Sequence, residues 1–499
     1  MNSMENRRTW SIIRTFALSL QLIAQILCVL IVLQLNMLPD KYVAIFVISM
    51  AVMAVGAGLL MFIRVNDKIG LWRKIVSGVL AFLILCGCAV ISKLAWDAHR
   101  LVDDLTGDPT TTRNTYVLVL NENAAHTLKE TKGYRFGAVE NYDLEHTEQM
   151  VAAVEKETGN QLSLKNYKQA AAMVDALYKK EVDALIMNGS SISLLLEQNG
   201  YGDFLSRVRI LFTLAYDDNK ADEPVSDISV VEEPFVVYIS GSDTRSKLLD
   251  VSRSDVNILA VVNPKTKQVL LLNTPRDYYV PNPAGKGKLD KLTHCSNYGV
   301  DCSIEALEGL YNVQINHYCQ INFTGFEKLI DAIGGITIYS DEAFKTIEGT
   351  YIKAGENTFD GKTALEFARE RYNVSGGDNG RGKNQMKVIK AVIEKMTSSK
   401  TLIGNYADIL KSLEGMFVTN FGTEEFSGIV KMQLGDMATW NVQSFAVTGK
   451  GDHQETYSWP GEKLYVMWPN EDMVNHAGKL IQKVFNGETL TAADTTLPK

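Results

Sequence analysis

Three apolar runs, FVVYI at 235–239, VNILAVV at 256–262 and QVLLLN at 268–273, predict neighbouring strands of one β-sheet. Each run is short, rich in Val, Ile and Leu, and almost wholly apolar, which is typical of a strand buried on both faces. Asn263–Lys267 joins the second and third runs and contains a proline, so we expect a hairpin turn there. These strands form the centre of a predicted α/β domain that begins near Val231.

Downstream of these strands, apolar residues recur at helical and strand-like spacings. Helices are predicted at Ile304–Tyr311, Thr324–Ile333 and Gln385–Met396, and strands at Cys319–Phe323 and Ile336–Tyr339. The segment 401–499 mixes both patterns, and we assign it to the same domain, which then covers residues 231–499. The predicted fold class is α/β, with a central mixed sheet flanked by helices.

A smaller α/β domain is predicted upstream, over residues 110–225, as an accessory domain without a catalytic motif. Strand-like runs at Tyr116–Leu120 and Val208–Ala215 enclose helical patterns at Glu148–Glu157 and Tyr167–Lys179. Another short apolar run lies between them at Asp183–Met187. The segment Asp217–Asp227 is rich in Asp, Glu and Pro, so we interpret it as the linker between the two domains.

The first hundred residues contain three long apolar runs, at 15–38, 42–63 and 75–96. A transmembrane helix needs about 20 apolar residues to cross the roughly 30 Å of hydrocarbon in a bilayer, and each run is long enough. Residues 1–100 are therefore predicted to form a three-helix transmembrane anchor.

Basic residues predict how this anchor is oriented. They precede the first run and fill the loop between the second and third runs, at Arg7, Arg8, Arg14, Arg64, Lys68, Arg73 and Lys74. The loop 39–41 between the first two runs has one Lys and one Asp. Since cytoplasmic loops carry an excess of Lys and Arg, we expect a multi-pass cell-membrane protein. Its N-terminus is then cytoplasmic and its two α/β domains are extracytoplasmic.

Net charge divides the chain in the same way. Residues 1–100 carry a net charge of +6 and the whole chain −8, which leaves −14 for residues 101–499. Such an acidic segment is a poor general binder of nucleic acid, so nucleic acid is not an expected partner. A cluster of arginines within it needs a local reason.

The cysteines and histidines give little indication of a disulfide framework or a metal site. Three cysteines lie outside the apolar runs, and an odd number leaves at least one free or paired with another chain. A bridge between Cys295 and Cys302 in an oxidising compartment stays open. The spacing of Cys and His matches no common metal site.

Charged clusters instead lie at the ends of predicted strands and helices. They occur at 240–245, 252–255, 275–277, 290–291, 369–371 and 376–381. In open α/β sheets, ligands bind at strand ends. Many arginines with two aspartates suit a phosphate or pyrophosphate held with a divalent cation, because Arg bonds phosphate oxygens in pairs and Mg²⁺ prefers oxygen ligands.

Two pairs of residues sharpen this hypothesis. Arg381 and Gln385 are four apart at the start of a predicted helix, so they would share one face near an N-terminal dipole that favours anions. Arg369 and Arg371 share one side if that stretch is extended.

Each cluster also has a plain structural interpretation. Arg–Asp pairs are often surface ion pairs worth about 0–1 kcal/mol. Glu366, Arg369 and Glu370 could form a solvated helical face, and Gly376–Gly380 could be an ordinary loop. Taken together, the clusters favour a site, because arginines buried at strand ends without an anionic ligand would be costly.

Seven motifs occur in series through this region. They are SGSDTR at 240–245, SRSD at 252–255, TPRD at 274–277, DKLTH at 290–294, DAIGGI at 331–336, ALEFARERY at 364–372 and GGDNGRGKNQ at 376–385. In this order they resemble the LytR-CpsA-Psr family over about residues 231–400, the motif core of the larger domain. The three-helix anchor and the accessory domain resemble the streptococcal capsule-type branch of that family.

The resemblance implies a Mg²⁺-dependent phosphotransferase. Such proteins take a glycan polymer, capsular polysaccharide in this branch, from a polyprenyl-pyrophosphate carrier and attach it to peptidoglycan through a phosphodiester bond. The implied partners are the carrier-linked glycan, the peptidoglycan acceptor, the membrane and other capsule-synthesis membrane proteins. An apolar pocket in the sheet is implied for the polyprenyl tail.

The resemblance also assigns roles to individual residues. Asp243 and Asp255 are implied as ligands of Mg²⁺, with Mn²⁺ as the alternative ion. The implied pyrophosphate-binding residues are Arg253, Arg276, Lys291, Arg369, Arg371, Arg381 and Gln385. The implied catalytic set is Asp243, Arg253, Asp255, Arg371 and Arg381. Asp378 or Asp243 could accept the proton of the acceptor hydroxyl if either lies within hydrogen-bond reach.

Two other functions stay open at this point. The same site could hydrolyse the pyrophosphate linkage, with water in place of the acceptor hydroxyl. Alternatively, the chain could be a non-enzymatic membrane regulator or assembly partner of capsule synthesis, with the 110–225 domain binding a ligand.

Overall fold

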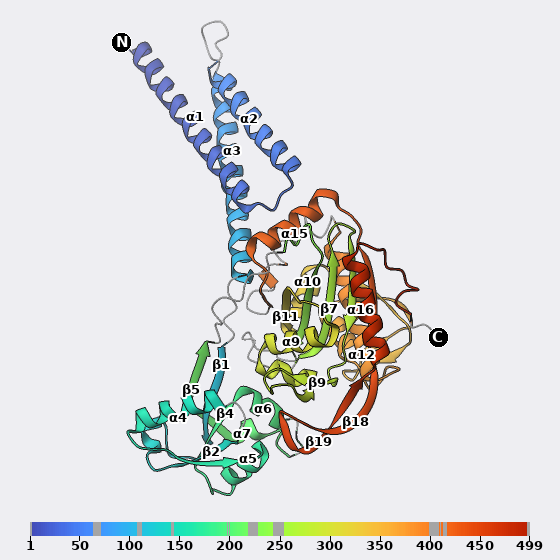
Figure 1. The fold of residues 1–499 in the computed structure, drawn as a ribbon. Helices are drawn as coiled ribbons and strands as arrows, with labels where there is room; N and C mark the ends of the chain where they lie inside the picture. The colour runs from blue at the N-terminus through green and yellow to red at the C-terminus, as the bar shows by residue number, and fades with distance from the viewer. Residues whose placement is uncertain are drawn as a thin grey trace.

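The computed structural model describes residues 2–62, 71–106, 112–140, 144–196, 198, 200–217, 228–242, 254–398, 409, 411–412 and 417–496. Figure 1 shows long N-terminal helices, a small sheet with its own helices, and a larger body around a central sheet. The protein is therefore mixed α/β with N-terminal apolar helices, as predicted. The domain boundaries 1–100, 110–225 and 231–499 stay predictions.

Three helices form the N-terminal part, namely α1 (Asn2–Leu35), α2 (Asp40–Phe62) and α3 (Leu71–Thr106). Each contains a segment that is long and apolar enough to cross a membrane, and these segments are Ile12–Leu35, Asp40–Phe62 and Ile75–Arg100. The three predicted apolar runs are thus confirmed as helices of membrane-spanning length and composition.

The small sheet has five strands in the order β3-β2-β4-β1-β5. Its elements are β1 (Thr112–Leu120), β2 (Arg135–Val139), α4 (Leu144–Thr158), β3 (Ser163–Tyr167), α5 (Ala170–Tyr178), β4 (Ala184–Asn188), α6 (Gly189–Leu196), α7 (Phe204–Arg207) and β5 (Val208–Asp217). β2 runs parallel to β3 and β4, whereas β1 runs antiparallel to β4 and β5. The sheet is therefore mixed.

Two strands of this sheet were not predicted. β3 lies at the edge of the sheet and is exposed or half-buried along its whole length, so its sequence SLKNY carries no apolar pattern. Tyr167 ends this strand, and the helix predicted to begin there starts instead at Ala170. β2 was missed because its five residues include a central glycine, Gly137.

The larger body is built on a six-stranded mixed sheet with the order β16-β11-β6-β7-β8-β17. Its strands are β6 (Phe235–Ser242), β7 (Ser254–Asn263), β8 (Gln268–Asn273), β11 (His317–Asn322), β16 (Phe417–Thr419) and β17 (Asn441–Ala446). β7 runs antiparallel to β6 and β8, while β11 runs parallel to β6 and β17 parallel to β8. The predicted hairpin between β7 and β8 is confirmed.

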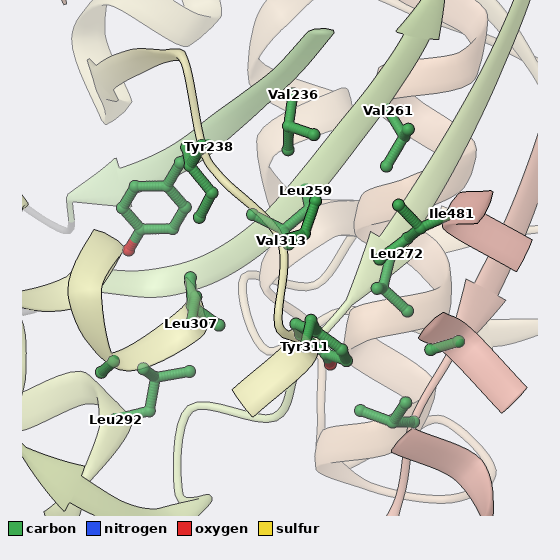
Figure 2. Close-up of a cluster of buried hydrophobic side chains, with 14 of the residues drawn as sticks. Val236, Tyr238, Leu259, Val261, Leu272, Leu292, Leu307, Tyr311, Val313 and Ile481 are labelled. Carbon is green, nitrogen blue, oxygen red and sulfur yellow. The ribbon is translucent and has the colours of Figure 1, made fainter. Parts of the chain in front are cut away.

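Alternate side chains of the central strands point into two apolar layers. One layer contains Val236, Tyr238, Leu259 and Leu272 with Leu307 of α9 (Val300–Tyr311) and Ile481 of α16 (Glu471–Phe485), as Figure 2 shows. The opposite layer contains Phe235, Val237, Ile258 and Leu271 with Met386 of α12 (Asp378–Met396). Burial on both faces explains why these strands have continuous apolar sequences.

The remaining elements surround this core. The helices are α8 (Leu292–Cys295), α10 (Phe323–Ala332), α11 (Gly361–Arg369) and α15 (Thr423–Asp436). The two-stranded sheets pair β9 (Tyr279–Asn282) with β10 (Lys288–Lys291), β12 (Ile336–Ser340) with β15 (Gly355–Phe359), β13 (Phe344–Lys345) with β14 (Tyr351–Ile352), and β18 (Gly449–Thr456) with β19 (Trp459–Pro469).

Two expectations of local structure near the charged clusters need correction. The condition that the stretch 369–371 is extended holds only from Glu370 onward, because α11 begins after its N-cap Asp360, whose side chain accepts the N–H of Thr363, and continues to Arg369. α12 begins at Asp378 rather than Gln385. Gly380 and Gly382 lie near its start, and the low helix propensity of glycine explains why the sequence did not predict this part of the helix.

Candidate active site

The ends of four strands meet at one edge of the six-stranded sheet. Because β7 is antiparallel to its two neighbours and β11 is parallel to β6, the carboxyl ends of β6, β8 and β11 lie beside the amino end of β7. A cavity of about 520 Å³ opens there. Six of the predicted site residues line it, namely Asp255, Arg276, Arg369, Arg371, Arg381 and Gln385.

Asp255 lies between two guanidinium groups. Its Oδ1 accepts a hydrogen bond of 2.7 Å from Arg276 Nη1, and its Oδ2 lies 4.0 Å from Arg381 Nη1. Arg381 Nη2 also pairs with Oδ1 of Asp378, which lies one turn earlier on α12, at 2.6 Å. The two arginine side chains are largely shielded from solvent. Two arginines and two aspartates therefore form one shielded network at the cavity.

Burial and charge act in opposite directions on these arginines. Burial disfavours the cation at Arg276, but Asp255 and Asp277 outweigh it and hold the pKa of this guanidinium above its ordinary value. At Arg381 burial is the stronger effect and lowers the pKa, against the attraction of Asp378. Both groups stay cationic at neutral pH because arginine starts from so high a pKa. Both guanidinium groups thus stay charged at the cavity, where Asp255 and Asp378 balance them.

Arg369 and Arg371 reach the cavity from the end of α11. The Arg369 guanidinium lies 4.5 Å above the ring centre of Phe323 and 3.4 Å from Glu348 Oε1. The Arg371 guanidinium lies 4.6 Å above the ring of its neighbour Tyr372. Both arginines are thus supported by aromatic rings, a favourable arrangement for a cation.

Glu370 fixes the turn between these two arginines. It is buried, and its carboxylate accepts backbone N–H bonds from Ile347, Tyr372 and Asn373 at 2.8–3.0 Å. Burial favours the neutral acid, but these donors hold the pKa of Glu370 below its ordinary value. Glu366 is buried as well. The interpretation of these glutamates as a solvated face is therefore wrong.

Apolar side chains also line the cavity. Phe323 and Phe326 come from α10, Leu365 and Ala368 from α11, and Ile389 from α12. The resemblance implied an apolar pocket in the sheet for the polyprenyl tail, but sequence reasoning named none of these five residues for it. The two phenylalanines, three residues apart at the start of a predicted helix, are the signal that could have found it.

Lys291 lies behind the cavity wall rather than on it. Its Nζ bonds to Asp277 Oδ1 at 3.0 Å, and Asp277 Oδ2 lies 3.8 Å from Arg276 Nε. Lys291 therefore supports the network through Asp277, an acidic residue whose part in the site was not predicted.

Asp290, next to Lys291, anchors a neighbouring hairpin. It is fully buried and contacts His294 Nδ1 at 2.6 Å, while it accepts bonds of 3.1 Å from Asn282 Nδ2 and the Ser458 backbone N–H. Burial alone would favour the neutral acid, but His294 and the other donors hold the pKa of Asp290 below its ordinary value. This cluster ties β10 to the turn between β18 and β19.

The predicted metal site is described only in part. Asp243 and Arg253 lie within 243–253, outside the described residues. Within the described ranges, no group of three His, Cys, Asp or Glu side chains is placed to hold a metal ion. Asp255 does present a carboxylate at the cavity, beside the arginines. One carboxylate next to a pyrophosphate site fits Mg²⁺, which is often held by one or two carboxylates and phosphate oxygens.

Cys295 and Cys302 are both free and buried, so the disulfide considered between them is not formed in this structure. The two thiols interact, and this contact together with burial raises the pKa of Cys295 well above its ordinary value. Their surroundings therefore favour neutral, packed thiols.

Comparisons with known proteins cover this part of the chain. The model of the LytR_cpsA_psr family matches residues 212–471. A relative from Enterococcus faecalis, named polyisoprenyl-teichoic acid–peptidoglycan teichoic acid transferase TagU, is 36% identical over 200 residues, which is 40% of this chain and 65% of the relative. A relative of the same name from Oceanobacillus iheyensis is 34% identical over 242 residues, which is 47% of this chain and 73% of the relative.

The chain thus spans about two thirds of the length of these curated relatives. Among solved structures, Bacillus subtilis TagV aligns with 52% of this chain and 99% of its own, at 24% identity and a TM-score of 0.43.

Proposed function

Because the chain belongs to the LytR_cpsA_psr family, we propose that it transfers a glycan polymer from a polyprenyl-pyrophosphate carrier to peptidoglycan through a phosphodiester bond. The TagU relatives are named for such a transfer of teichoic acid. The single observation that carries the proposal is the 520 Å³ cavity, which is lined both by guanidinium groups and by aromatic and aliphatic side chains.

The two kinds of side chain in this cavity match the two parts of a lipid pyrophosphate, its charged head and its apolar tail. Arginines donate paired hydrogen bonds to phosphate oxygens, and among the described lining residues four arginines face one carboxylate, Asp255. Phe323, Phe326 and Leu365 offer a surface on which a prenyl chain leaves water. A hydrophilic phosphate compound would leave this apolar wall unused, and an uncharged lipid would leave the arginines unused.

The proposed reaction requires positive charge next to the phosphoryl group that is transferred. The oxygen of an acceptor hydroxyl, which we assign to a muramic acid residue, bonds to the phosphorus next to the sugar. The bond from that phosphorus to the bridging oxygen breaks, and polyprenyl phosphate leaves with the proton that the hydroxyl gives up. Negative charge then spreads over the phosphoryl oxygens, and Arg276 and Arg381 are fixed where they stabilise it, shielded from water.

Asp255, together with Asp243, would hold a divalent cation, which we propose to be Mg²⁺. Such an ion neutralises pyrophosphate oxygens and favours their departure. Asp255 has a second role that needs no ion, because its hydrogen bond fixes the Arg276 guanidinium in one orientation. Gln385, on the same face of α12 as Arg381, adds an amide donor to the cavity.

We further propose that the polymer is capsular polysaccharide, because the anchor and the accessory domain resemble the capsule-type branch; the teichoic acid of the TagU relatives is the alternative. The basic residues that flank the apolar helices support a cytoplasmic N-terminus. The cavity then lies on the outer side of the membrane, where peptidoglycan is present.

The test uses the full chain in lipid vesicles with a polyprenyl-pyrophosphate-linked glycan, Mg²⁺ and peptidoglycan fragments, and identifies products by mass spectrometry. We expect glycan joined to peptidoglycan and released polyprenyl phosphate, both lost in Arg381→Ala. Arg135→Ala is the matched control, because Arg135 forms an exposed ion pair with Asp183 in the small sheet. Released glycan phosphate without joining would indicate a hydrolase, and absence of any turnover would overturn the proposal.

A further inference from the structure

The loop between α1 and α2 is docked on the larger body. Lys41 Nζ donates a 2.6 Å hydrogen bond to the carbonyl of Gly435 at the end of α15. Lys431, on the same helix, pairs with Asp40 at 2.8 Å and lies 3.4 Å from Asn36 Oδ1. Figure 1 shows α15 next to the ends of α1 and α2. Polar contacts therefore join the two membrane-spanning helices to α15.

Met37, in the same loop, extends this contact into the apolar interior. It is 4% exposed and belongs to the buried cluster that contains Ala368, with Phe326 and Ile321 packed against that cluster. Ala368, Phe326 and Ile321 also line the cavity. One apolar cluster therefore continues from the loop to the apolar lining of the cavity.

The position of this loop relative to the membrane suggests a role for its contact with the larger body. The first apolar segment ends at Leu35 and the second begins at Asp40, so Met37 lies at the membrane surface. A methionine there would ordinarily meet headgroups or water, yet it is buried in the core of another part of the chain. A carrier whose tail stays in the bilayer while its pyrophosphate reaches the arginines must pass between these two places.

We propose that Met37 is part of the carrier-binding site and packs beside the section of the polyprenyl tail that leaves the cavity for the bilayer. This inference rests on the proposed transfer function and deepens it. A carrier with a short tail ends within the cavity and does not reach Met37. A carrier with a long tail does reach it, so the anchor loop makes the protein selective for long-chain carriers.

The test compares a farnesyl-linked and an octaprenyl-linked pyrophosphoryl glycan with the full chain in vesicles. For Met37→Ala, we expect kcat/KM with the octaprenyl carrier to fall roughly three- to tenfold, mainly through KM, since a smaller side chain covers less of the tail. The value with the farnesyl carrier should not change. Met37→Leu keeps the volume of the side chain and should restore selectivity.

Met53→Ala is the matched control, because Met53 is an exposed residue of α2 outside the cluster of Met37. Its selectivity should equal that of the unaltered protein. Equal losses with both carriers in Met37→Ala, or no loss with either, would overturn the inference while leaving the transfer function intact. Failure of the unaltered protein with both carriers would instead overturn the proposed function.

A second measurement tests the docking itself. The pair Asp40→Cys and Lys431→Cys is treated with a short bismaleimide in vesicles and compared with each single variant. We expect a crosslink in the double variant above that of the single variants, and transfer from the octaprenyl carrier should continue after crosslinking. Absence of the crosslink, or loss of transfer from the long carrier alone when it forms, would overturn the inference.

Discussion

Asp255 accepts a 2.7 Å hydrogen bond from Arg276, although the two residues are 21 positions apart. Asp255 lies at the start of β7 and Arg276 follows the end of β8. Since these strands form an antiparallel hairpin, the register of the hairpin brings carboxylate and guanidinium to the same edge of the sheet. The centre of the candidate site is thus built by local strand pairing.

Replacing this carboxylate should abolish most of the activity. In Asp255→Asn, Arg276 loses its hydrogen-bonded carboxylate and the proposed Mg²⁺ site loses one carboxylate, so we expect the transfer rate to fall about a hundredfold or more. Asp341→Asn is the control, because Asp341 forms an exposed pair with Lys387 at 2.6 Å. The measurement is the initial rate of product formation at saturating Mg²⁺. A rate in Asp255→Asn close to that of the control would contradict the assigned role.

The arginines should differ in how much they tolerate lysine. Arg381 is shielded and contacts two carboxylates, whereas Arg369 is about half exposed. Lysine keeps the charge but loses the planar pair of donors, so we expect Arg381→Lys to lower kcat/KM by roughly a hundredfold and Arg369→Lys by less than about tenfold. Steady-state kinetics of both variants test this order. Equal losses of kcat/KM would mean that the burial of an arginine does not determine how well it tolerates replacement by lysine.

The central strands could be predicted because burial on both faces leaves a continuous apolar sequence. Once Phe235–Ile239, Val256–Val262 and Gln268–Asn273 are paired in order, the charged residues at their ends must come close together. The gathering of Asp255 and Arg276 at one cavity therefore follows from sequence order and strand direction alone.

Other parts of the site depend on information that spacing does not contain. The direction of a side chain decides that Lys291 bonds to Asp277 behind the wall, and a motif cannot show this. The turn after Arg369 depends on Glu370 accepting three backbone donors, two of them local and one from Ile347. Met37 has the sequence context of a membrane-surface residue, and only the tertiary contact shows it buried.

Acid should weaken the sheet near His317. This residue is almost fully buried and stacks on Phe421 with ring centres 4.0 Å apart. Burial lowers its pKa from 6.5 to about 4. Between pH 6.5 and pH 4, His317 binds a proton in the unfolded chain but stays neutral in the folded protein. The free energy of unfolding therefore falls as the pH drops from 6.5 towards 4, by up to about 3 kcal/mol.

Hydrogen exchange of the β11 amides at pH 7 and pH 5 measures this loss. His317→Phe should lose less protection than the unaltered protein between these pH values, while the exposed control His453→Phe should behave like the unaltered protein. Glu425 lies 3.5 Å from His317 and burial raises its pKa, so its protonation acts in the opposite sense and moderates the loss. The same pH dependence in His317→Phe as in the unaltered protein would assign the effect to other groups.

Gly361 should be intolerant of any side chain, because it lets α11 approach α10. A Cβ at this position would overlap the carbonyl oxygen of Glu327 on α10, and backbone atoms cannot move aside as a flexible side chain does. The two helices carry the apolar wall of the cavity, including Phe326 and Leu365.

We therefore expect Gly361→Ala to lower the free energy of unfolding by about 1–3 kcal/mol through overpacking. Transfer from a polyprenyl carrier should fall as well, because the wall is displaced. Gly478→Ala, at a helical position of α16 where a Cβ meets nothing within 4 Å, should instead stabilise the protein by up to about 1 kcal/mol. Thermal unfolding and transfer rates of the two variants, measured side by side, test this. Equal stability of the two would show that α10 and α11 separate freely and that the wall of the cavity is not rigid.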